Sequence, residues 1–424
     1  MFRPAAFRLK FAPRFPGQMI PSRAFSEESL ARYCQGGYHP VRIGDSFADG
    51  RYKILCKLGY GAYSTVWLAS DSLAKRHVAL KFLTADSYGH QQDTFEIDIL
   101  KKIKAKSEVF TGSQHLLGLL DKFEHVGPNG KHICLVSKAM GPDMSNFRRL
   151  FPSARIPVPL MKSISRQLLL ALSFLHDTCQ VIHSGSFLPS YPADMQILTR
   201  ASDIKPQNIL IETAEINEMF DNAPSEVFLP QRPPLDSPND FYIESSQISS
   251  AGEDLSQATD VAVRLADFGT ASWSTHHLTE WIQPQMLRAP EVILGASWDY
   301  KVDVWNLGLI IWELSEGALV FDGSWSASAP YTSEAHLAQM QAVLGKMPQS
   351  LISRSSERDR FFDKEGQLLI PSTFPDMPLE TICRDPRMSG TDKVLFVDMI
   401  KSMIRLEPND RPDARSLLKS AWLK

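Results

Sequence analysis

The fold is decided by the stretch Asp203-Ile204-Lys205-Pro206-Gln207-Asn208, which is followed along the chain by Asp267-Phe268-Gly269 and Ala289-Pro290-Glu291. An acid, a base two residues later and a carboxamide five residues later suit the transfer of a phosphoryl group. Asp203 would orient the accepting hydroxyl and Lys205 would neutralise the charge of the phosphoryl group. Asn208 and Asp267 would supply oxygen ligands for a metal ion.

A glycine-containing turn, Gly59-Tyr60-Gly61-Ala62-Tyr63-Ser64, lies between two runs that predict strands, 51–58 and 64–69. Glycines two residues apart let the backbone approach phosphate groups closely and offer N–H donors. The same pattern would also fit a plain hairpin turn. The candidate nucleotide-binding residues here are Leu58, Gly59, Gly61 and Val66, the last of which would cover a flat base.

Lys81 lies near the end of an apolar strand predicted over 77–83, where its ammonium group needs a partner. Glu96, fifteen residues later on a predicted helix over 94–104, could pair with it and fix it against phosphate oxygens. The alternative is a surface lysine at a strand end. The stretch Ser137–Gly141, which includes Ala139 and Met140, would offer backbone groups to adenine.

In this order the motifs resemble the signature set of the protein-kinase superfamily. The resemblance implies an α+β, bilobal fold with a small antiparallel-sheet N-lobe and a larger helical C-lobe, and it implies ATP and Mg²⁺. It also assigns structural roles. Asp303 would brace the catalytic loop, Arg411 would pair with Glu291, and His183 would pack beneath Phe268 and Gly269.

The stretches 33–41, 43–45, 50–52 and 64–69 narrow the resemblance to the SR-protein kinase family. That implies a serine/threonine kinase acting on serines of Arg/Ser-rich or basic proteins, with splicing factors among its partners, in the cytoplasm and nucleus. We expect a monomer without direct nucleic-acid or membrane contacts. The predicted divisions are a basic tail 1–32, an N-lobe 33–141 and a C-lobe 142–424 that carries two insertions, 184–201 and 212–260.

The first insertion separates His183 from Asp203 by nineteen residues, where the family has one. Two interpretations stay open: a translated intron of 54 nucleotides, in frame, or a genuine insertion. A genuine insertion would weaken catalysis, because a misplacement of about 1 Å can cost about 10²-fold in rate. It would favour a catalytically impaired pseudokinase that acts as a scaffold.

Charge is unevenly spread along a chain of 424 residues with a net charge of −3. Residues 1–26 contain five basic residues and no acid, which fits either a mitochondrial transit peptide or a disordered tail. Residues 212–260 contain eleven acids and one base. This second insertion is expected to be an extended linker, although it could attract basic substrates.

Two further features concern substrate and regulation. Ser202 precedes Asp203 where many phosphorylation-activated kinases carry arginine, so we expect activity that does not depend on phosphorylation of Thr270, Thr275 or Thr279. The family docks basic peptides on acids of the helical lobe. Here the corresponding stretch 333–337 offers Glu334, whereas Gln341 and Ala342 offer no charge.

Overall fold

The computed structural model describes residues 27–87, 94–108, 111–185, 204–213, 239–245, 260–388 and 390–424. Residues 1–26 of the predicted basic tail, Ser202, Asp203 and most of both predicted insertions lie outside these described residues. The chain divides into two compact units. The first contains Met1–Asp93, Gly118–Pro142 and Ile211–Leu255, and the second contains Thr94–Leu117, Asp143–Leu210 and Ser256–Lys424.

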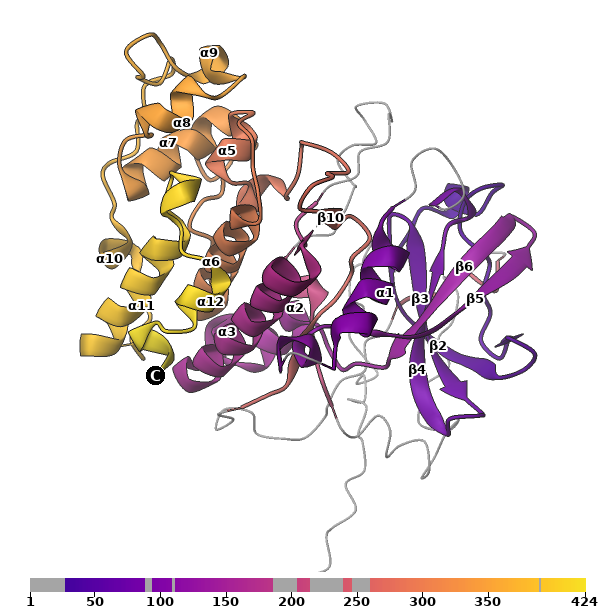
Figure 1. Ribbon diagram of the computed structural model, residues 1–424. Helices are drawn as coiled ribbons and strands as arrows, with labels where there is room; N and C mark the ends of the chain where they lie inside the picture. Colours follow the sequence, from indigo (N-terminus) through magenta and orange to yellow (C-terminus); the bar gives the residue numbers. More distant parts are fainter. Residues whose placement is uncertain are drawn as a thin grey trace, which may run out of the picture. The chain divides into compact units, whose positions relative to one another are not determined.

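The first unit is built on a six-stranded antiparallel sheet with the order β1-β2-β3-β4-β6-β5 (Figure 1). Its strands are β1 (Ser46–Phe47), β2 (Tyr52–Gly61), β3 (Ser64–Asp71), β4 (Arg76–Leu83), β5 (Leu119–Gly127) and β6 (Gly130–Lys138). The sequence did not predict β5, since its residues are mostly half-exposed and polar. That composition is typical of an edge strand with one face toward water.

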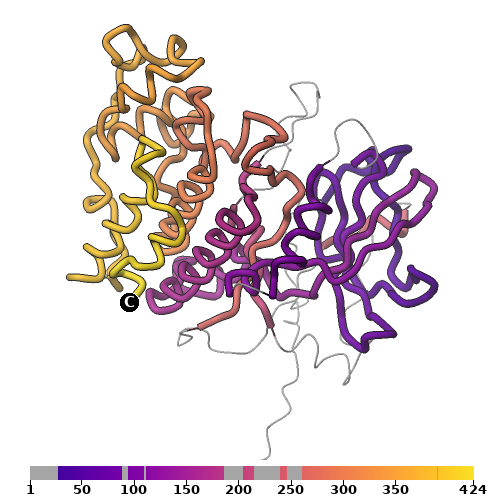
Figure 2. The backbone as a smooth tube through the Cα atoms, in the orientation of Figure 1, coloured from indigo at the N-terminus to yellow at the C-terminus, as the bar shows by residue number. Residues whose placement is uncertain are grey.

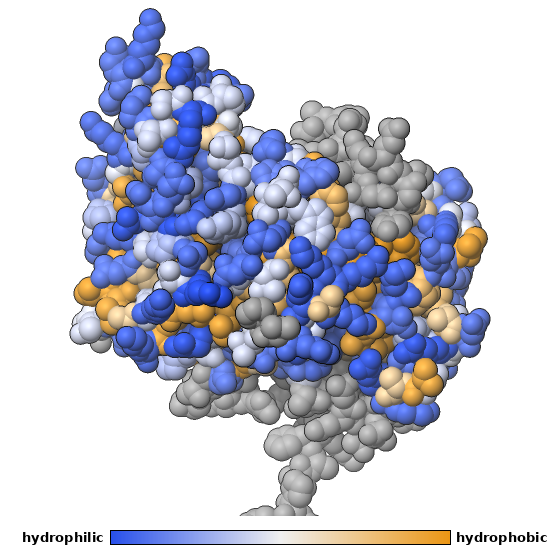
Figure 3. All heavy atoms as spheres, viewed as in Figure 1, coloured by the Kyte–Doolittle hydropathy of each residue, from blue (hydrophilic) through white to orange (hydrophobic). Residues whose placement is uncertain are grey.

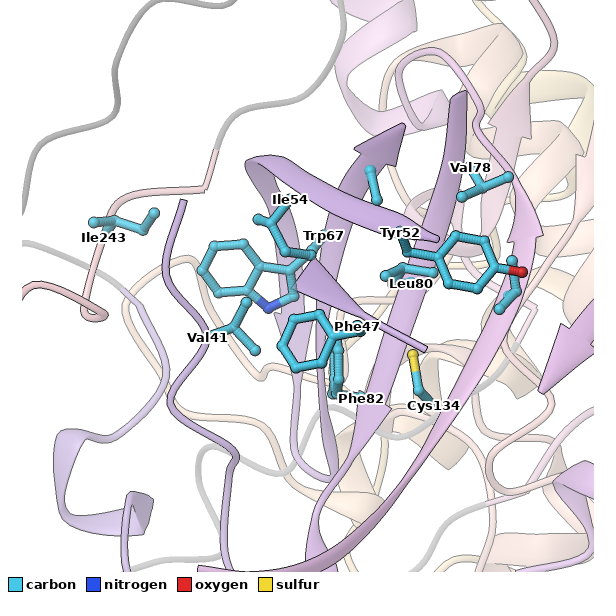
Figure 4. Packing of buried hydrophobic residues seen from close by; sticks show 12 residues of the cluster. Val41, Phe47, Tyr52, Ile54, Trp67, Val78, Leu80, Phe82, Cys134 and Ile243 are labelled. Carbon is cyan, nitrogen blue, oxygen red and sulfur yellow. The ribbon is translucent and has the colours of Figure 1, made fainter. Parts of the chain in front are cut away.

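The core of the first unit lies against this sheet (Figure 4). Trp67 on β3 and Leu80 on β4 are fully buried, together with Val41 from the segment that precedes the sheet. Because β4 lies between β3 and β6, it is apolar on both faces over 78–80, which is the pattern of a central strand.

One part of the acidic insertion belongs to this core. Ile243 is 1% exposed and packs in the same cluster as Trp67 and Val41 (Figure 4). The expectation of an extended linker is therefore wrong for residues 239–245. The insertion is acidic on average, but it contains a short apolar and aromatic stretch, Phe241-Tyr242-Ile243, that can bury its side chains.

The second unit is mainly helical (Figure 2). Its helices are α1 (Glu96–Lys106), α2 (Met144–Phe147), α3 (Val158–Ser173), α5 (Pro290–Ile293), α6 (Lys301–Glu316), α7 (Ser333–Leu344), α8 (Gln349–Ser353), α9 (Arg358–Phe361), α10 (Leu379–Ile382), α11 (Gly390–Met403) and α12 (Ala414–Leu417). Short strands β7 (Val181–Ile182) and β10 (Ser272–Trp273) form one pair, and β8 (Ile209–Ile211) and β9 (Val263–Leu265) form another.

The interior of the second unit is formed by α3 and α6. Nearly every residue of α6 is buried, as the apolar stretch from Leu307 to Leu314 predicts. A continuous helical stretch, Pro152–Cys179, is long and apolar enough to span a membrane, but most of its apolar window is buried inside the unit. It is therefore a core helix of this unit. Hydrophilic residues predominate on the face shown in Figure 3.

The predicted fold class, α+β with a small antiparallel-sheet part and a larger helical part, is confirmed. The two units differ from the predicted lobes in two stretches. Ile211–Leu255, which we predicted within the C-lobe, groups with the sheet unit. Thr94–Leu117, which we predicted in the N-lobe, groups with the helical unit, because α1 packs against the end of the α3 stretch and Phe95 lies 5.2 Å from the ring of His276.

Candidate active site

The glycine turn joins β2 to β3, and Gly61 pairs with Ser64 across it. A methyl group at Gly59 would meet no atom within 4 Å, and Gly59 is not among the glycines with positive φ. Neither packing nor backbone conformation therefore requires glycine at this position. The open space beside Gly59 suits the close approach of a ligand phosphate to the backbone.

Lys81 lies at the centre of the sheet, where it is paired with Val66 on β3 and Leu135 on β6. It is half-buried, so the alternative of an exposed lysine at a strand end is not what the structure shows. Glu96, at the start of α1, is 3% exposed in the second unit. Because the two residues belong to different units, their pairing stays a prediction.

The predicted adenine-binding stretch, Ser137–Gly141, begins in the last two residues of β6, and Ala139 and Met140 within it are buried. The Gly141 N–H donates to the carbonyl of Ile211 at 2.8 Å, and the Ile211 N–H donates to Pro142 at 3.0 Å. A methyl group at Gly141 would lie 2.8 Å from a side-chain carbon of Thr213. The close approach of the 211–213 segment therefore requires glycine here.

In the second unit, the carboxylate of Asp303 on α6 fixes the chain after β7. It accepts the backbone N–H of His183 and of Ser184, each at 2.8 Å, and it lies 2.8 Å from Nε2 of His176. Burial by itself raises the pKa of Asp303, but the hydrogen bond from His176 and those from the loop outweigh it and lower that pKa. The carboxylate therefore stays ionised and holds the loop in place.

The first two residues of the predicted insertion 184–201 lie within the described part of the chain. Ser184 is fully buried, and its hydroxyl accepts a hydrogen bond from Asn306 at 3.2 Å. A methyl group on Gly185 would lie 1.7 Å from the carbonyl oxygen of Thr270. Both residues are thus built into the loop. Residue 202 is also serine, so removal of 184–201 or of 185–202 leaves the same sequence, and the sequence alone could not place this boundary.

His183 connects the catalytic loop to the Asp267-Phe268-Gly269 segment. Its ring lies edge-on to Phe268 at 5.0 Å, and its Nε2 is 3.1 Å from the carbonyl oxygen of Ala266. Burial lowers the pKa of His183, so the ring is neutral near pH 7, and Nε2–H donates to that carbonyl. The predicted position of His183 beneath this segment is what the structure shows.

The two predicted metal ligands lie on paired segments of the second unit. Asn208 is 7% exposed, and its carbonyl oxygen accepts the N–H of Ala266, the residue before Asp267, at 2.8 Å. Asp267 has a φ of 64°, a left-handed conformation that is costly for a residue other than glycine and that occurs preferentially at functional sites.

Asn208 directly precedes β8 and Asp267 follows β9, the strand that pairs with β8, and a carboxamide and a carboxylate both supply the oxygen ligands that Mg²⁺ prefers. Within the described ranges, no group of three or more His, Cys, Asp and Glu side chains could hold a metal ion. Asn208 and Asp267 are oxygen ligands of the kind that Mg²⁺ takes, usually one or two from the protein together with phosphate oxygens.

Glu291 and Arg411 form the pair expected from the resemblance. The guanidinium donates to both carboxylate oxygens, at 2.6 and 2.8 Å, and both side chains are fully buried. Arg411 also lies over the ring of Trp305, 4.8 Å from its centroid. The pair joins α5, which contains Glu291, to the segment directly before α12, which contains Arg411.

Comparisons with known proteins agree with this geometry. The protein kinase domain family matches residues 52–185 and 194–423, and the interruption falls inside the predicted first insertion. The chain is 32% identical to the serine/threonine-protein kinase SRPK of Physarum polycephalum, over 94% of this chain and 91% of the relative. This chain is a serine/threonine-protein kinase of the SRPK family.

Other relatives of this SRPK-family kinase include protein kinase dsk1 of Schizosaccharomyces pombe, 28% identical over 96% of this chain and 86% of the relative. SRSF protein kinase 3 of Mus musculus is 25% identical over 97% of this chain and 93% of the relative. The protein-kinase domain implies ATP as the phosphoryl donor, typically with Mg²⁺. The alternative of a pseudokinase scaffold is not supported by these relatives.

The structure brings together part of the predicted site of the kinase and leaves part untested. His183, Asn208, Asp267, Phe268 and Asp303 form one connected group in the second unit. Lys205 follows buried Ile204 and is half-buried. Asp203 lies outside the described residues. Its role and those of the nucleotide-binding residues stay predictions.

Sequence reasoning missed two structural residues of this site. His176 reaches Asp303 from the helical stretch that precedes β7, and Tyr38 donates to the carbonyls of the glycine turn. A buried position in an apolar helix was the available signal for His176. Tyr38 lies in the stretch 33–41, whose only signal was resemblance to the family, so its contact with a turn 23 residues away could not be derived from the sequence.

Proposed function

We propose that this kinase transfers the γ-phosphoryl group of ATP to serines of Arg/Ser-rich or otherwise basic proteins. The observation that carries the proposal is the connection of Asn208 to the segment of Asp267, because it arranges two oxygen ligands for a magnesium–nucleotide complex. The basic substrate class is supported by the names of the relatives, one of which is an SRSF protein kinase.

The chain's own residues would divide the work as follows. The backbone at Gly59 and Gly61 would bind phosphates, Lys81 would orient them, and Ala139 and Met140 would offer backbone groups to the base. Asp203 would hold the serine hydroxyl in line, and Lys205 would neutralise the transferred group. Bound ATP with Mg²⁺ supplies the phosphoryl group and most of the charge compensation, so the protein acts mainly by positioning.

The substrate-docking surface differs from the family's expected one. Glu334 lies in the first turn of α7 and is half-exposed, so it is available to a basic peptide. Ala342, on the same helix, is buried and uncharged. We propose that a substrate arginine contacts Glu334. With one acid at this helix, the kinase would hold a short basic peptide rather than a long arginine tract.

The test is phosphate incorporation from labelled ATP into an Arg-Ser repeat peptide in the presence of Mg²⁺. Two matched control peptides carry glutamine for every arginine and alanine for every serine. We expect incorporation into the first peptide, at least tenfold less into the glutamine peptide and none into the alanine peptide. Asp267→Asn should abolish incorporation. Equal incorporation into the glutamine peptide would contradict the basic substrate class.

Glu334→Gln separates docking from chemistry. We expect the KM for the Arg-Ser peptide to rise about three- to tenfold, because loss of a partly desolvated charge pair costs about 1 kcal/mol. The kcat and the KM for ATP should be unchanged. An unchanged peptide KM would place the docking acid elsewhere.

A further inference from the structure

The tip of the glycine turn is held by a residue from the segment that precedes the sheet. The hydroxyl of Tyr38 lies 2.7 Å from the carbonyl oxygen of Gly61 and 3.1 Å from that of Ala62. Tyr38 is 4% exposed. Burial raises the pKa of its hydroxyl, which therefore stays protonated and can donate to these carbonyls at any physiological pH.

Tyr38 contacts a row of aromatic rings, and the last of these rings belong to the acidic insertion. The rings of Tyr38 and Tyr33 are 5.4 Å apart, and Tyr33 lies 4.8 Å from the ring of Phe241 and 6.4 Å from that of Tyr242. These distances fall in the range of favourable aromatic pairs. A continuous line of contacts thus connects residues 239–245 to the tip of the turn.

A second connection reaches the strand that leads into the turn. Lys57 on β2, two residues before Gly59, is fully buried. Its ammonium group donates to Glu27 at 2.9 Å, to both oxygens of Glu28 and to the carbonyl of Ile243 at 3.1 Å. A buried ammonium is stable only with such a set of acceptors, so the strand and the insertion segment depend on each other.

The insertion segment has further attachments at its ends. The backbone N–H and the hydroxyl of Ser245 each donate to Glu27 at 2.7 Å, and Tyr242 donates to the carbonyl of Glu28 at 2.8 Å. Residues 239–245 are therefore a built part of the first unit, although the chain reaches them through an insertion of strongly acidic composition. Nothing in the phosphoryl-transfer chemistry itself uses these contacts.

We propose that Tyr38 is a positioning residue for the glycine turn, and that residues 239–245 lock Tyr38 and Lys57 in place, so that the acidic insertion sets the affinity of the kinase for ATP. This inference rests on the proposal that the turn binds the phosphates of ATP. It gives the insertion a role in nucleotide binding that is independent of any attraction to basic substrates.

The physical argument concerns the conformational freedom of the turn. A glycine-containing hairpin that is free to move loses that freedom on binding nucleotide, and a turn that is already held in place does not. Loss of the Tyr38 hydroxyl would remove one hydrogen-bond donor from the two turn carbonyls. The affinity for ATP should then fall, while the groups that carry out the transfer stay where they are.

The experiment compares Tyr38→Phe and Phe241→Ala with Tyr52→Phe in the full chain. Tyr52 is the matched control, because its buried hydroxyl on the same strand as Gly59 contacts Asp121 at 3.2 Å, away from the turn. The readouts are the Kd of a fluorescent ATP analogue, the KM for ATP, the kcat and the KM for the Arg-Ser peptide.

We expect Tyr38→Phe and Phe241→Ala to raise the Kd and the KM for ATP about three- to tenfold, with kcat and peptide KM unchanged, and Tyr52→Phe to leave all four values unchanged. If Phe241→Ala does not fold, Ser245→Glu provides the second variant. It places a negative charge beside Glu27, releases the segment by repulsion and should raise the Kd similarly.

The outcomes separate the two proposals. If the unsubstituted protein does not bind the ATP analogue, the proposed nucleotide site is wrong. If it binds the analogue and Tyr38→Phe binds equally well, the positioning role of Tyr38 is wrong. If Tyr38→Phe weakens binding while both Phe241→Ala and Ser245→Glu do not, the insertion does not control the turn.

Discussion

The carboxylate of Asp303 accepts the backbone N–H of Ser184 at 2.8 Å and so fixes the loop as far as Ser184. In the family, the catalytic aspartate would follow directly after this residue. Deletion of residues 185–202 joins Ser184 to Asp203. We expect this deletion to raise kcat at least tenfold, because extra residues directly before Asp203 would shift its carboxylate, and a shift of about 1 Å can cost about 10²-fold in rate.

The control for the deletion is the same protein with Asp203→Asn, which should be inactive. An unchanged kcat would show that the inserted residues loop out and leave Asp203 in place. Sequencing of the mature transcript across this region tests the intron interpretation separately. A message that retains all 54 nucleotides would make the insertion a genuine part of the kinase.

Substitution of Gly59 and of Gly112 by alanine should separate a glycine needed for ATP binding from a glycine needed for the fold. Gly59→Ala places a methyl group in open space, so the midpoint of thermal unfolding should not change, whereas the KM for ATP should rise about tenfold. Gly112→Ala would place a methyl group 2.2 Å from the carbonyl oxygen of Leu170. It should lower the unfolding midpoint without a specific effect on the KM for ATP.

The outcome for Gly59 has a clear alternative. If Gly59→Ala leaves the KM for ATP unchanged, the turn is a plain hairpin, as the sequence pattern also allowed. If it lowers the unfolding midpoint as much as Gly112→Ala, the glycine serves the fold. Either result would remove Gly59 from the candidate nucleotide-binding residues.

The fold class could be predicted because its signals are local. Strand-like runs flank the turn that contains Gly59, and an apolar run predicts the buried helix that contains Leu307. The position of Ser184 could not be predicted, because it depends on Asp303, 119 residues away, and because a second serine at 202 makes the two boundaries equivalent.

The acidic insertion illustrates a different limit. The net charge of the whole insertion, 212–260, predicts a segment exposed to water, yet Ile243 is buried with Trp67. A window average cannot detect three consecutive apolar or aromatic residues whose partners come from β2 and β3 and from the segment before the sheet. The buried Lys57, an exception to the rule that lysine lies at the surface, also depends on Glu27 and Glu28 from that segment.

The buried pair of Glu291 and Arg411 should be sensitive to the loss of either partner. Arg411→Lys keeps the charge but cannot donate to both carboxylate oxygens, and Glu291→Gln removes the charge. Glu291→Gln should lower the free energy of unfolding by about 3–5 kcal/mol, because the guanidinium of Arg411 stays buried without a countercharge. Arg411→Lys should lower it by less, because a positive charge remains beside Glu291. Urea unfolding at pH 7.5 measures the change.

A double substitution provides the control for this pair. Glu291→Leu combined with Arg411→Met removes both charges and should destabilise the protein by less than the sum of the two single leucine and methionine changes. Additive effects of the two changes would contradict a direct energetic coupling between these side chains.

We expect kinase activity that does not depend on phosphorylation of the loop threonines, and the position of Thr270 decides which substitutions can test this. Thr270 is buried, and its hydroxyl donates to the carbonyl of Gly185 at 2.9 Å, so Thr270→Ala should destabilise the loop for a reason unrelated to phosphorylation. Thr275→Ala with Thr279→Ala is the cleaner variant. We expect kcat to stay within about threefold of the original value, and a collapse of kcat would show that the loop requires a phosphate.

The last prediction concerns the acid stability of the first unit. His39 is buried beside His125 and His132, whose rings are 4.6 and 5.0 Å away. Burial is the main cause that lowers its pKa to about 3, and the charges of His125, His132 and Arg42 act in the same direction. An unfolded histidine has a pKa of about 6.5.

Between pH 6.5 and about 3, the unfolded chain therefore binds a proton at this position that the folded chain does not bind. Stability from His39 is fully present above pH 6.5 and decreases as the pH falls through that range. His39→Gln should flatten the dependence of the urea midpoint on pH between 7.5 and 5. His336 in the second unit, whose pKa burial also lowers to about 3, should account for part of the dependence that remains. Parallel curves for the variant and the original protein would show that the pKa of His39 is the same in the folded and unfolded states.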